Sequence, residues 1–173
     1  GIHSLAGYGG TESDVTTIGD ELQRTGHEVW IYSPEGGLAA EAADRLGLRV
    51  VARAGELPDE LDAALPQDAA SCLELAAARP GCPQFYISHS DTFDLQLVPQ
   101  VRGLVRAVFT LYRRAHERVS AQALEVPVER LRQPVDVERF KPTSGLNSEP
   151  KCALSFGNYL SGARLEMLRE ACV

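Results

Sequence analysis

Short apolar runs alternate along the chain with longer stretches in which apolar positions recur at helical spacing. The runs predict strands at 1–5, 27–32, 48–52, 61–65, 84–88, 104–111 and 128–131. The helical spacing predicts helices from Thr11 toward Gly26 and at 38–46, 68–79 and 113–124, with a short irregular or helical piece at 92–101. The repetition of strand, turn and helix predicts right-handed crossovers and an α/β fold with a Rossmann-like, doubly wound parallel sheet.

Residues at both ends of the first helix match known helix signals. Thr11 can cap the N-terminus with its hydroxyl, and Asp14 follows three residues later as a variant of the capping box. Gly26 suits the left-handed conformation that ends many helices. We therefore expect this helix to begin at Thr11, within the glycine-rich stretch AGYGGTE at 6–12.

The composition of the chain changes after residue 132. Prolines and then small polar residues fill the segment 133–150, which is the composition of a linker. A strand predicted at 152–156 and a helix predicted at 164–172 then start a new α/β unit. We expect three parts: a Rossmann-like domain at 1–132, an interdomain hinge at 133–150, and the start of a truncated second domain at 151–173.

Composition also limits the class of function. The 173 residues carry a formal net charge of −7, which disfavours nucleic acid as a partner. No apolar run approaches the roughly 18 residues of a membrane-spanning helix, and the start of the chain lacks a signal-peptide pattern. No C-x-x-C pair is present, so we expect a cytoplasmic protein without a zinc site, whose reduced cysteines are Cys72, Cys82, Cys152 and Cys172.

The glycine-rich turn is the first candidate for ligand chemistry. Backbone N–H groups and the helix dipole favour an anion at such a turn, and glycine lets a phosphate approach closely. Gly7 and Gly9 match the first two glycines of the dinucleotide fingerprint, but Glu12 stands at the third position. The Gly-Lys-Ser/Thr of a P-loop is absent too. The turn is either a phosphate-capable loop of another kind or a tight turn without a ligand.

Three stretches together resemble the retaining GT-B glycosyltransferases of family 4. The stretch 7–37 has a Gly-Gly loop and then the pattern L-x-x-x-G-H-x-V before a strand. The stretch QFYISHS at 84–90 is similar to a family strand that ends in a histidine. The stretch LRQPVDVERFKP at 131–142 is similar to the interdomain pattern x-N-G-V-D-x-x-x-F-x-P, with Gln133-Pro134 in place of Asn-Gly. Proline stiffens that joint.

The resemblance implies a two-domain enzyme that transfers a sugar from a nucleotide-sugar donor to a hydroxyl acceptor with retention. This chain would be the acceptor-side domain, and a donor-binding domain would follow the hinge. Gly9 and Gly10 would approach the donor diphosphate, and His89 would line the cleft near the reacting sugar. The family needs no metal or other cofactor, because basic side chains and N–H dipoles stabilise the leaving diphosphate.

His89 is the catalytic candidate because it ends a predicted buried strand. Ligands of open α/β sheets bind beyond the carboxyl ends of the strands, and a histidine there can orient or deprotonate a hydroxyl. Alternatively, neighbouring serines satisfy the ring. His3 could also face the cleft, whereas His27 lies at the opposite end of the sheet as a structural residue. The candidates for binding the acceptor are Tyr8, Thr11, Glu12, Ser90, Asp91, Arg113 and Arg114.

Two groups of charged residues can be interpreted either as functional or as ordinary solvent-exposed charges. The arginines of 102–118 could meet an acidic acceptor or attach the protein weakly to the inner membrane face, or they could form a solvated surface. Glu117 and Glu125 have the spacing of the family's E-x7-E motif of the donor domain. They precede the hinge, so we interpret them as solvated charges.

Two other classes of protein have some of these sequence features. A non-catalytic Rossmann-like ligand-binding module is the alternative, and a downstream domain with the acidic motif distinguishes the enzyme from it. A nicotinamide oxidoreductase is disfavoured because the third glycine is missing. In addition, Tyr32, Ser33 and Pro34 stand where an acidic residue should close the second strand.

Overall fold

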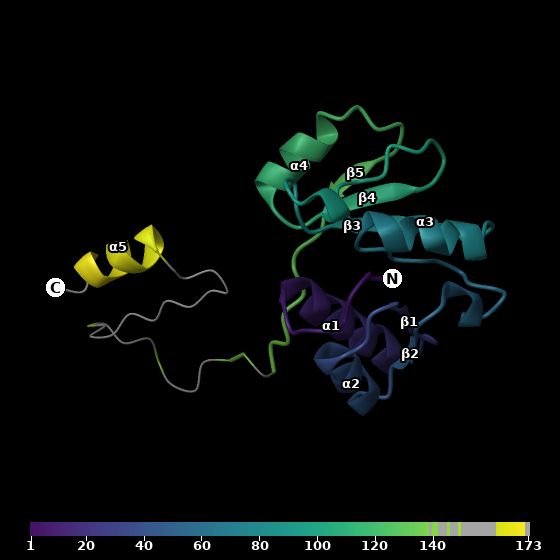
Figure 1. Ribbon diagram of the computed structural model, residues 1–173, viewed down its shortest axis with the longest axis horizontal. Helices are drawn as coiled ribbons and strands as arrows, with labels where there is room; N and C mark the ends of the chain where they lie inside the picture. The colour runs from purple at the N-terminus through teal and green to yellow at the C-terminus, as the bar shows by residue number, and fades with distance from the viewer. Residues whose placement is uncertain (139, 142–144, 146–148, 150–161, 172–173) are drawn as a thin grey trace. The chain divides into compact units, whose positions relative to one another are not determined.

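A computed structural model describes residues 1–138, 140, 141, 145, 149 and 162–171, and Figure 1 traces them. The chain divides into two compact units, Gly1–Val137 and Glu138–Val173. The boundary between the units falls inside the segment 133–150, for which the sequence predicts a hinge.

The second unit contains one helix among its described residues. This helix, α5 (Ala163–Ala171), lies where the sequence predicts a helix at 164–172. The strand predicted at 152–156 lies outside the described residues. No helix in the described part of the chain is long and apolar enough to cross a membrane.

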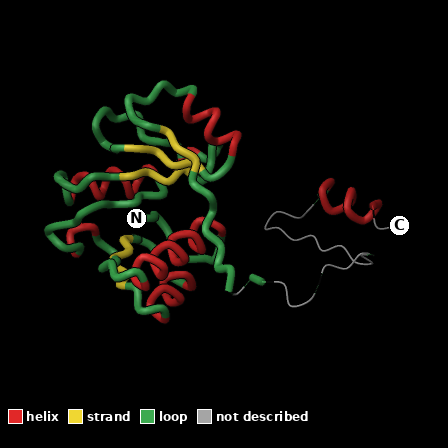
Figure 2. Tube along the Cα trace, turned by 180° about the vertical axis from the view of Figure 1, so that it is seen from behind, coloured by secondary structure: helices red, strands yellow, loops and turns green. Residues whose placement is uncertain are grey.

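The first unit alternates helices with short strands, as the sequence predicts (Figure 2). Its elements are α1 (Gly10–Arg24), β1 (Trp30–Tyr32), α2 (Leu38–Arg45), β2 (Arg49–Val51), η1 (Ala54–Glu56), α3 (Ala69–Ala78), β3 (Phe85–Ser88), η2 (Asp94–Gln96), β4 (Ala107–Thr110), α4 (Arg113–Ser120) and β5 (Val128–Arg130). Strand β1 pairs with β2, and β3, β4 and β5 pair in that order, all in parallel. The predicted α/β class with parallel strands is therefore confirmed.

Two extended segments, residues 1–5 and 64–67, connect the two sheets. Backbone hydrogen bonds of 2.8–3.0 Å make these connections. Ile2 N donates to Tyr32 O, which links 1–5 to β1, and Gln67 N donates to Gly1 O, which links 64–67 to 1–5. Ile87 N donates to Pro66 O, which links β3 to 64–67. The lateral order of extended segments is therefore β2, β1, 1–5, 64–67, β3, β4 and β5.

The strands predicted at 1–5 and 61–65 form isolated parallel bridges instead of ladders. A regular parallel ladder repeats its hydrogen bonds every two residues, but residues 1–5 bond to the β1 side at a spacing of three. On the opposite side of 1–5, the amide of His3 donates to the carboxylate of Asp68, the residue that follows 64–67, and not to a backbone carbonyl of that segment. A side-chain acceptor thus replaces a ladder bond on this segment.

Helices cover both faces of this arrangement. Ile31 of β1 packs in one core with Val15 of α1 and Ala39 of α2. The next residue, Tyr32, packs in another core with Leu75 of α3. Successive strand residues point to opposite faces, so α1 and α2 lie on one face and α3 lies on the other.

The two predicted end signals of α1 had different outcomes. Gly26 has a φ of +96° just beyond the helix, which confirms the predicted stop. The predicted cap by Thr11 is wrong, because the helix begins at Gly10 with Gly9 as its N-cap and has no side-chain cap. Thr11 is already inside the helix, and its Oγ1 accepts a hydrogen bond from Gln96 Nε2 over 3.2 Å.

Gly37 precedes α2 at a place where no side chain fits. An added Cβ would lie 2.6 Å from the carbonyl oxygen of Ala6, which already accepts a hydrogen bond from Leu38 N. We expect Gly37→Ala to lower the free energy of unfolding by about 1–3 kcal/mol, the usual effect of overpacking. Gly36→Ala is the matched control, because its Cβ would meet only Ala40 Cβ at 3.9 Å. Equal urea midpoints for the two variants would contradict this close contact.

Candidate functional site

The loops that follow residues 1–5 and β3 meet at the carboxyl edge of the strands. The first loop contains the Gly9–Gly10 turn and leads into α1, and the second runs from His89 to η2. The hydrogen bond between Gln96 and Thr11 joins η2 to the first turn of α1. Ligands of open α/β sheets bind at the carboxyl edge, so a ligand-binding site is expected here.

His89 lies at the centre of this edge with only 7% of its side chain exposed. Its Nε2 is 2.6 Å from Oε1 of Gln67, the last residue of the segment 64–67. The same nitrogen is 3.8 Å from Oδ2 of Asp14 in α1. An amide oxygen only accepts hydrogen bonds, so Nε2 carries the proton in this contact.

The neutral form of His89 is the one that fits these contacts. Burial lowers the pKa of His89 to about 4, so its ring is neutral near pH 7 and its approach to Asp14 is not an ion pair there. Since Nε2 donates to Gln67, Nδ1 is the unprotonated nitrogen, and no described residue donates a hydrogen bond to it. Such a ring accepts a hydrogen bond from a hydroxyl, and its low basicity suits orienting the hydroxyl more than deprotonating it.

Asp14 and two glutamines belong to the site, although sequence reasoning does not place them there. Asp14 is 3% exposed, and its Oδ2 has no hydrogen-bond partner among the described residues. Burial raises the pKa of Asp14, and a hydrogen bond with the side chain of Gln133 opposes this shift. Asp14 lies one helical turn before the apolar Ile18, so the sequence pattern indicates that Asp14 is on the same face of the helix as Ile18. Gln67 and Gln133 each lie two residues beyond a predicted strand.

The glycine turn presents the N-terminus of α1 without a side-chain cap. Gly9 is the N-cap, and a Cβ added to Gly10 would meet no atom within 4 Å. Glu12 folds back over the turn, because a Cβ on Gly9 would lie 2.5 Å from its Oε2. Tyr8, just before the turn, is 59% exposed. An anion that approaches this turn therefore meets the Glu12 carboxylate, which it must displace.

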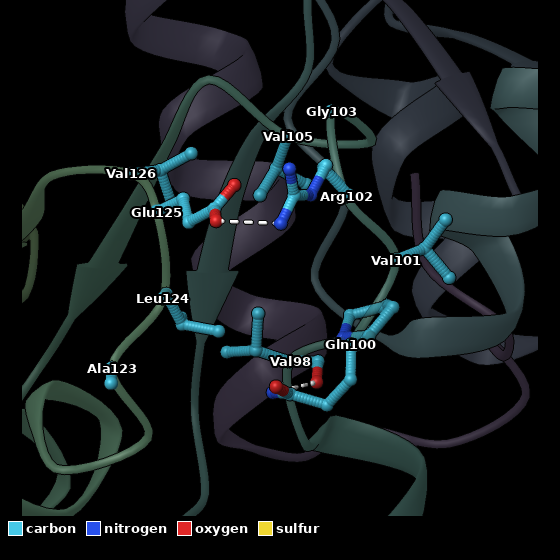
Figure 3. Close-up of a pocket in the computed structure, with 11 residues that line it drawn as sticks. Val98, Gln100, Val101, Arg102, Gly103, Val105, Ala123, Leu124, Glu125 and Val126 are labelled. Carbon is cyan, nitrogen blue, oxygen red and sulfur yellow. Dashed lines mark hydrogen bonds and ion pairs between the residues drawn. The ribbon is translucent and has the colours of Figure 1, made fainter.

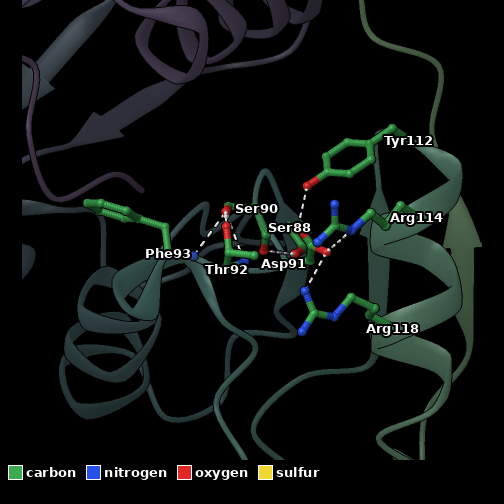
Figure 4. A network of polar contacts seen from close by, with 8 residues as sticks. All are labelled: Ser88, Ser90, Asp91, Thr92, Phe93, Tyr112, Arg114 and Arg118. Carbon is green, nitrogen blue, oxygen red and sulfur yellow. Dashed lines mark hydrogen bonds and ion pairs between the residues drawn. The ribbon is translucent and has the colours of Figure 1, made fainter. Parts of the chain in front are cut away.

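Asp91, two residues after His89, is the centre of a polar network with side chains of α4 and of Tyr112 just before it (Figure 4). Its Oδ2 accepts from Arg118 over 2.9 Å and lies 3.1 Å from Nε of Arg114, and its Oδ1 accepts from the Tyr112 hydroxyl over 2.9 Å. Hydrogen bonds from Arg118 and Tyr112 lower the pKa of Asp91. Both carboxylate oxygens are therefore engaged within the protein. Ser90 Oγ likewise accepts from the backbone of the same loop.

Arg113 takes no part in this network. Its side chain is exposed, and its Nε lies 3.6 Å from Glu117. Glu125 pairs with a different arginine, Arg102, at 2.8 Å. The two glutamates with the E-x7-E spacing thus contact separate arginines on the surface, in agreement with their interpretation as solvated charges.

Among the described residues, the side chains of the other histidines and of the cysteines make no hydrogen bond or ion pair with His89, Gln67 or Asp14. His3 Nε2 is 3.7 Å from Glu35 Oε1, and His27 is exposed after the end of α1. Cys72 and Cys82 are free thiols. Within the described ranges, no group of three or more His, Cys, Asp or Glu side chains is placed to hold a metal ion.

A cavity of about 150 Å³ lies at the opposite, amino edge of the sheet, where the segments before β4 and β5 face each other (Figure 3). Val98, Val105 and Leu124 contribute apolar side chains to its wall. Arg102 and Glu125 form their ion pair at this cavity. The cavity thus lies at the edge opposite His89 and the Gly9–Gly10 turn.

Comparison with models of known protein families found no match, and neither did searches of curated proteins and of solved structures. A function for this chain therefore rests on the residues and geometry of its carboxyl edge. That edge combines a neutral buried histidine, an uncapped glycine turn and a pair of arginines.

Proposed function

We propose that this chain is the acceptor-side domain of a retaining GT-B glycosyltransferase, with a doubly wound Rossmann-like sheet. The lateral order of extended segments supports the fold, because numbering them along the chain gives 3-2-1-4-5-6-7. Doubly wound dinucleotide-binding sheets have the order 3-2-1-4-5-6. Their ligands bind where the order reverses, which in this chain is between residues 1–5 and 64–67.

The contact of His89 with Gln67 is the observation that carries the proposal. Gln67 ends the segment 64–67, so the contact lies beside the reversal point. It leaves Nδ1 of the neutral ring as a hydrogen-bond acceptor for a sugar or acceptor hydroxyl. Fixing one hydroxyl in a reactive position can supply a large part of a rate enhancement.

The remaining candidates take roles around this histidine. The N–H groups at Gly9 and Gly10 meet the diphosphate of a nucleotide-sugar, which a donor-binding domain after the hinge holds from the other side. Dipoles and basic side chains stabilise the leaving diphosphate without a metal ion. Asp91 acts through the arginines that it holds. Direct contacts to the acceptor come from Tyr8, Thr11, Ser90 and Arg114.

Removing the charge of Glu12 should strengthen binding of the donor diphosphate. The Glu12 carboxylate lies over Gly9, where it repels a phosphate. We expect Glu12→Gln in the full-length protein to bind uridine or guanosine diphosphate about tenfold more tightly, a change on the order of 1 kcal/mol. Glu21→Gln is the control, because Glu21 pairs with Arg24 at the far end of α1. Calorimetry that finds equal affinities for both variants would exclude the turn as the phosphate site.

Nucleotide release from a panel of nucleotide-sugars tests the proposed function. The full-length protein is expected to release nucleotide from one donor in the presence of hydroxyl acceptors. Nucleotide binding without release from any donor would favour a non-catalytic ligand-binding module instead. Absence of both binding and release would overturn the proposal.

A further inference from the structure

Arg114 and Arg118 converge on a single carboxylate. Both arginines extend from α4 toward Asp91, which follows β3 (Figure 4). The side chain of Asp91 is only 6% exposed, whereas Arg114 and Arg118 are 68% and 51% exposed. The carboxylate is thus an internal anchor, and the two guanidinium groups face solvent.

The charges in this network do not cancel. One carboxylate faces two guanidinium groups, and the remaining partner, Tyr112, is a neutral hydroxyl that donates to Asp91 Oδ1. The network therefore has one positive charge in excess, in a chain whose formal net charge is −7. A local excess of positive charge on an acidic protein attracts anions selectively to that place.

Hydrogen-bond donors also remain. A guanidinium group has five N–H donors. Arg114 approaches Asp91 through Nε, and Arg118 donates through one terminal nitrogen. The unused donors lie on groups whose positions Asp91 already restricts, so a ligand that binds them orders little additional side chain.

We propose that Arg114 and Arg118 form a binding site for a phosphate group; their shared partner Asp91 lies two residues after His89 in the chain. Each guanidinium group presents a fork of parallel N–H donors that matches two oxygens of a phosphate. The site would bind the phosphate of a phosphorylated acceptor while His89 contacts its hydroxyl. This use of the site rests on the proposed glycosyl transfer, but the binding of phosphate does not.

Titration of the chain with inorganic phosphate and glycerol phosphate, followed by NMR of amide and arginine Nε–H signals, tests the proposal. We expect the signals of Arg114 and Arg118 to shift with millimolar affinity. The double variant Arg114→Gln/Arg118→Gln should bind at least tenfold more weakly. Arg113→Gln should stay within twofold of wild type, because Arg113 lies on the same turn and pairs with Glu117. Equal binding by the double variant, or shifts confined to other residues, would overturn the site.

A charge-conserving variant guards against a loss of fold in the double variant. Arg114→Lys/Arg118→Lys keeps both charges but loses the paired N–H geometry, so we expect weakened but measurable binding. Sedimentation with phosphatidylcholine vesicles that contain phosphatidic acid identifies the source of the phosphate. If wild type sediments with the vesicles and the double Gln variant does not, the phosphate belongs to a lipid headgroup. If wild type binds phosphate but does not sediment with the vesicles, the ligand is a soluble phosphate. If neither probe binds, the proposal is wrong, whatever the outcome of the donor assay.

Discussion

His89→Gln in the full-length protein is expected to lower kcat/KM for sugar transfer by about a hundredfold, the effect of misplacing a reacting group by about 1 Å. The wild-type ring donates from Nε2 to Gln67 and offers Nδ1 to a hydroxyl. Glutamine is polar and of similar length, but it lacks the rigid ring that lets histidine contact Gln67 and the hydroxyl at the same time. Initial rates across donor and acceptor concentrations give the measurement.

A matched control separates this effect from a general disturbance. His27 is exposed beyond the C-terminal end of α1, whereas the candidate site lies at the N-terminal end of this helix. His27→Gln is therefore expected to transfer sugar at the wild-type rate. If His89→Gln retained more than a third of wild-type activity while still folded, His89 would have no catalytic role.

The free energy of unfolding should fall by about 3 kcal/mol as the pH decreases from 6.5 to 4, because of the protonation of His89 alone. Burial lowers the pKa of His89 from its ordinary value of 6.5 to about 4. Between those values the unfolded chain binds a proton that the folded chain does not, so acid favours unfolding. The contribution is fully present above pH 6.5 and lost as the pH falls toward 4.

Urea unfolding of wild type and His89→Gln at pH 7 and pH 4.5 isolates this contribution. Asp14 acts in the opposite direction, because burial raises its pKa and its ionisation at higher pH destabilises the folded chain. The difference between the two proteins therefore reports on His89 more cleanly than the wild-type slope. His27→Gln should keep the wild-type dependence. If the free energy of unfolding changed with pH by the same amount in wild type and His89→Gln, His89 would not be buried as described.

The order of helices and strands could be predicted because each element carries its own local pattern. The apolar run of 84–88 and the glycine stop at Gly26 are examples. The lateral order of the strands could not be predicted in the same way, because it depends on which distant segments share hydrogen bonds. Two of the predicted strands, 1–5 and 61–65, form only isolated bridges, in the region between the two sheets.

The same reason limits what could be predicted of the candidate site. His89 could be selected because the end of a buried strand is a local feature. Its contact with Gln67 could not, because it requires the segment 64–67 to lie beside β3. Thr11 was misplaced as a cap because the two glycines before it allow α1 to begin earlier. Asp91 could be selected by position, but its engagement by arginines of α4 depends on how that helix packs.

The anomeric proton of the transferred sugar, followed by ¹H NMR during the reaction of the full-length protein, tests the central claim most directly. This signal reports both the transfer and its stereochemistry. We predict that the donor signal declines while a glycoside signal of the same anomeric configuration grows with the acceptor present. A donor signal that persists unchanged with every nucleotide-sugar and acceptor would contradict the assignment of this chain to a glycosyltransferase.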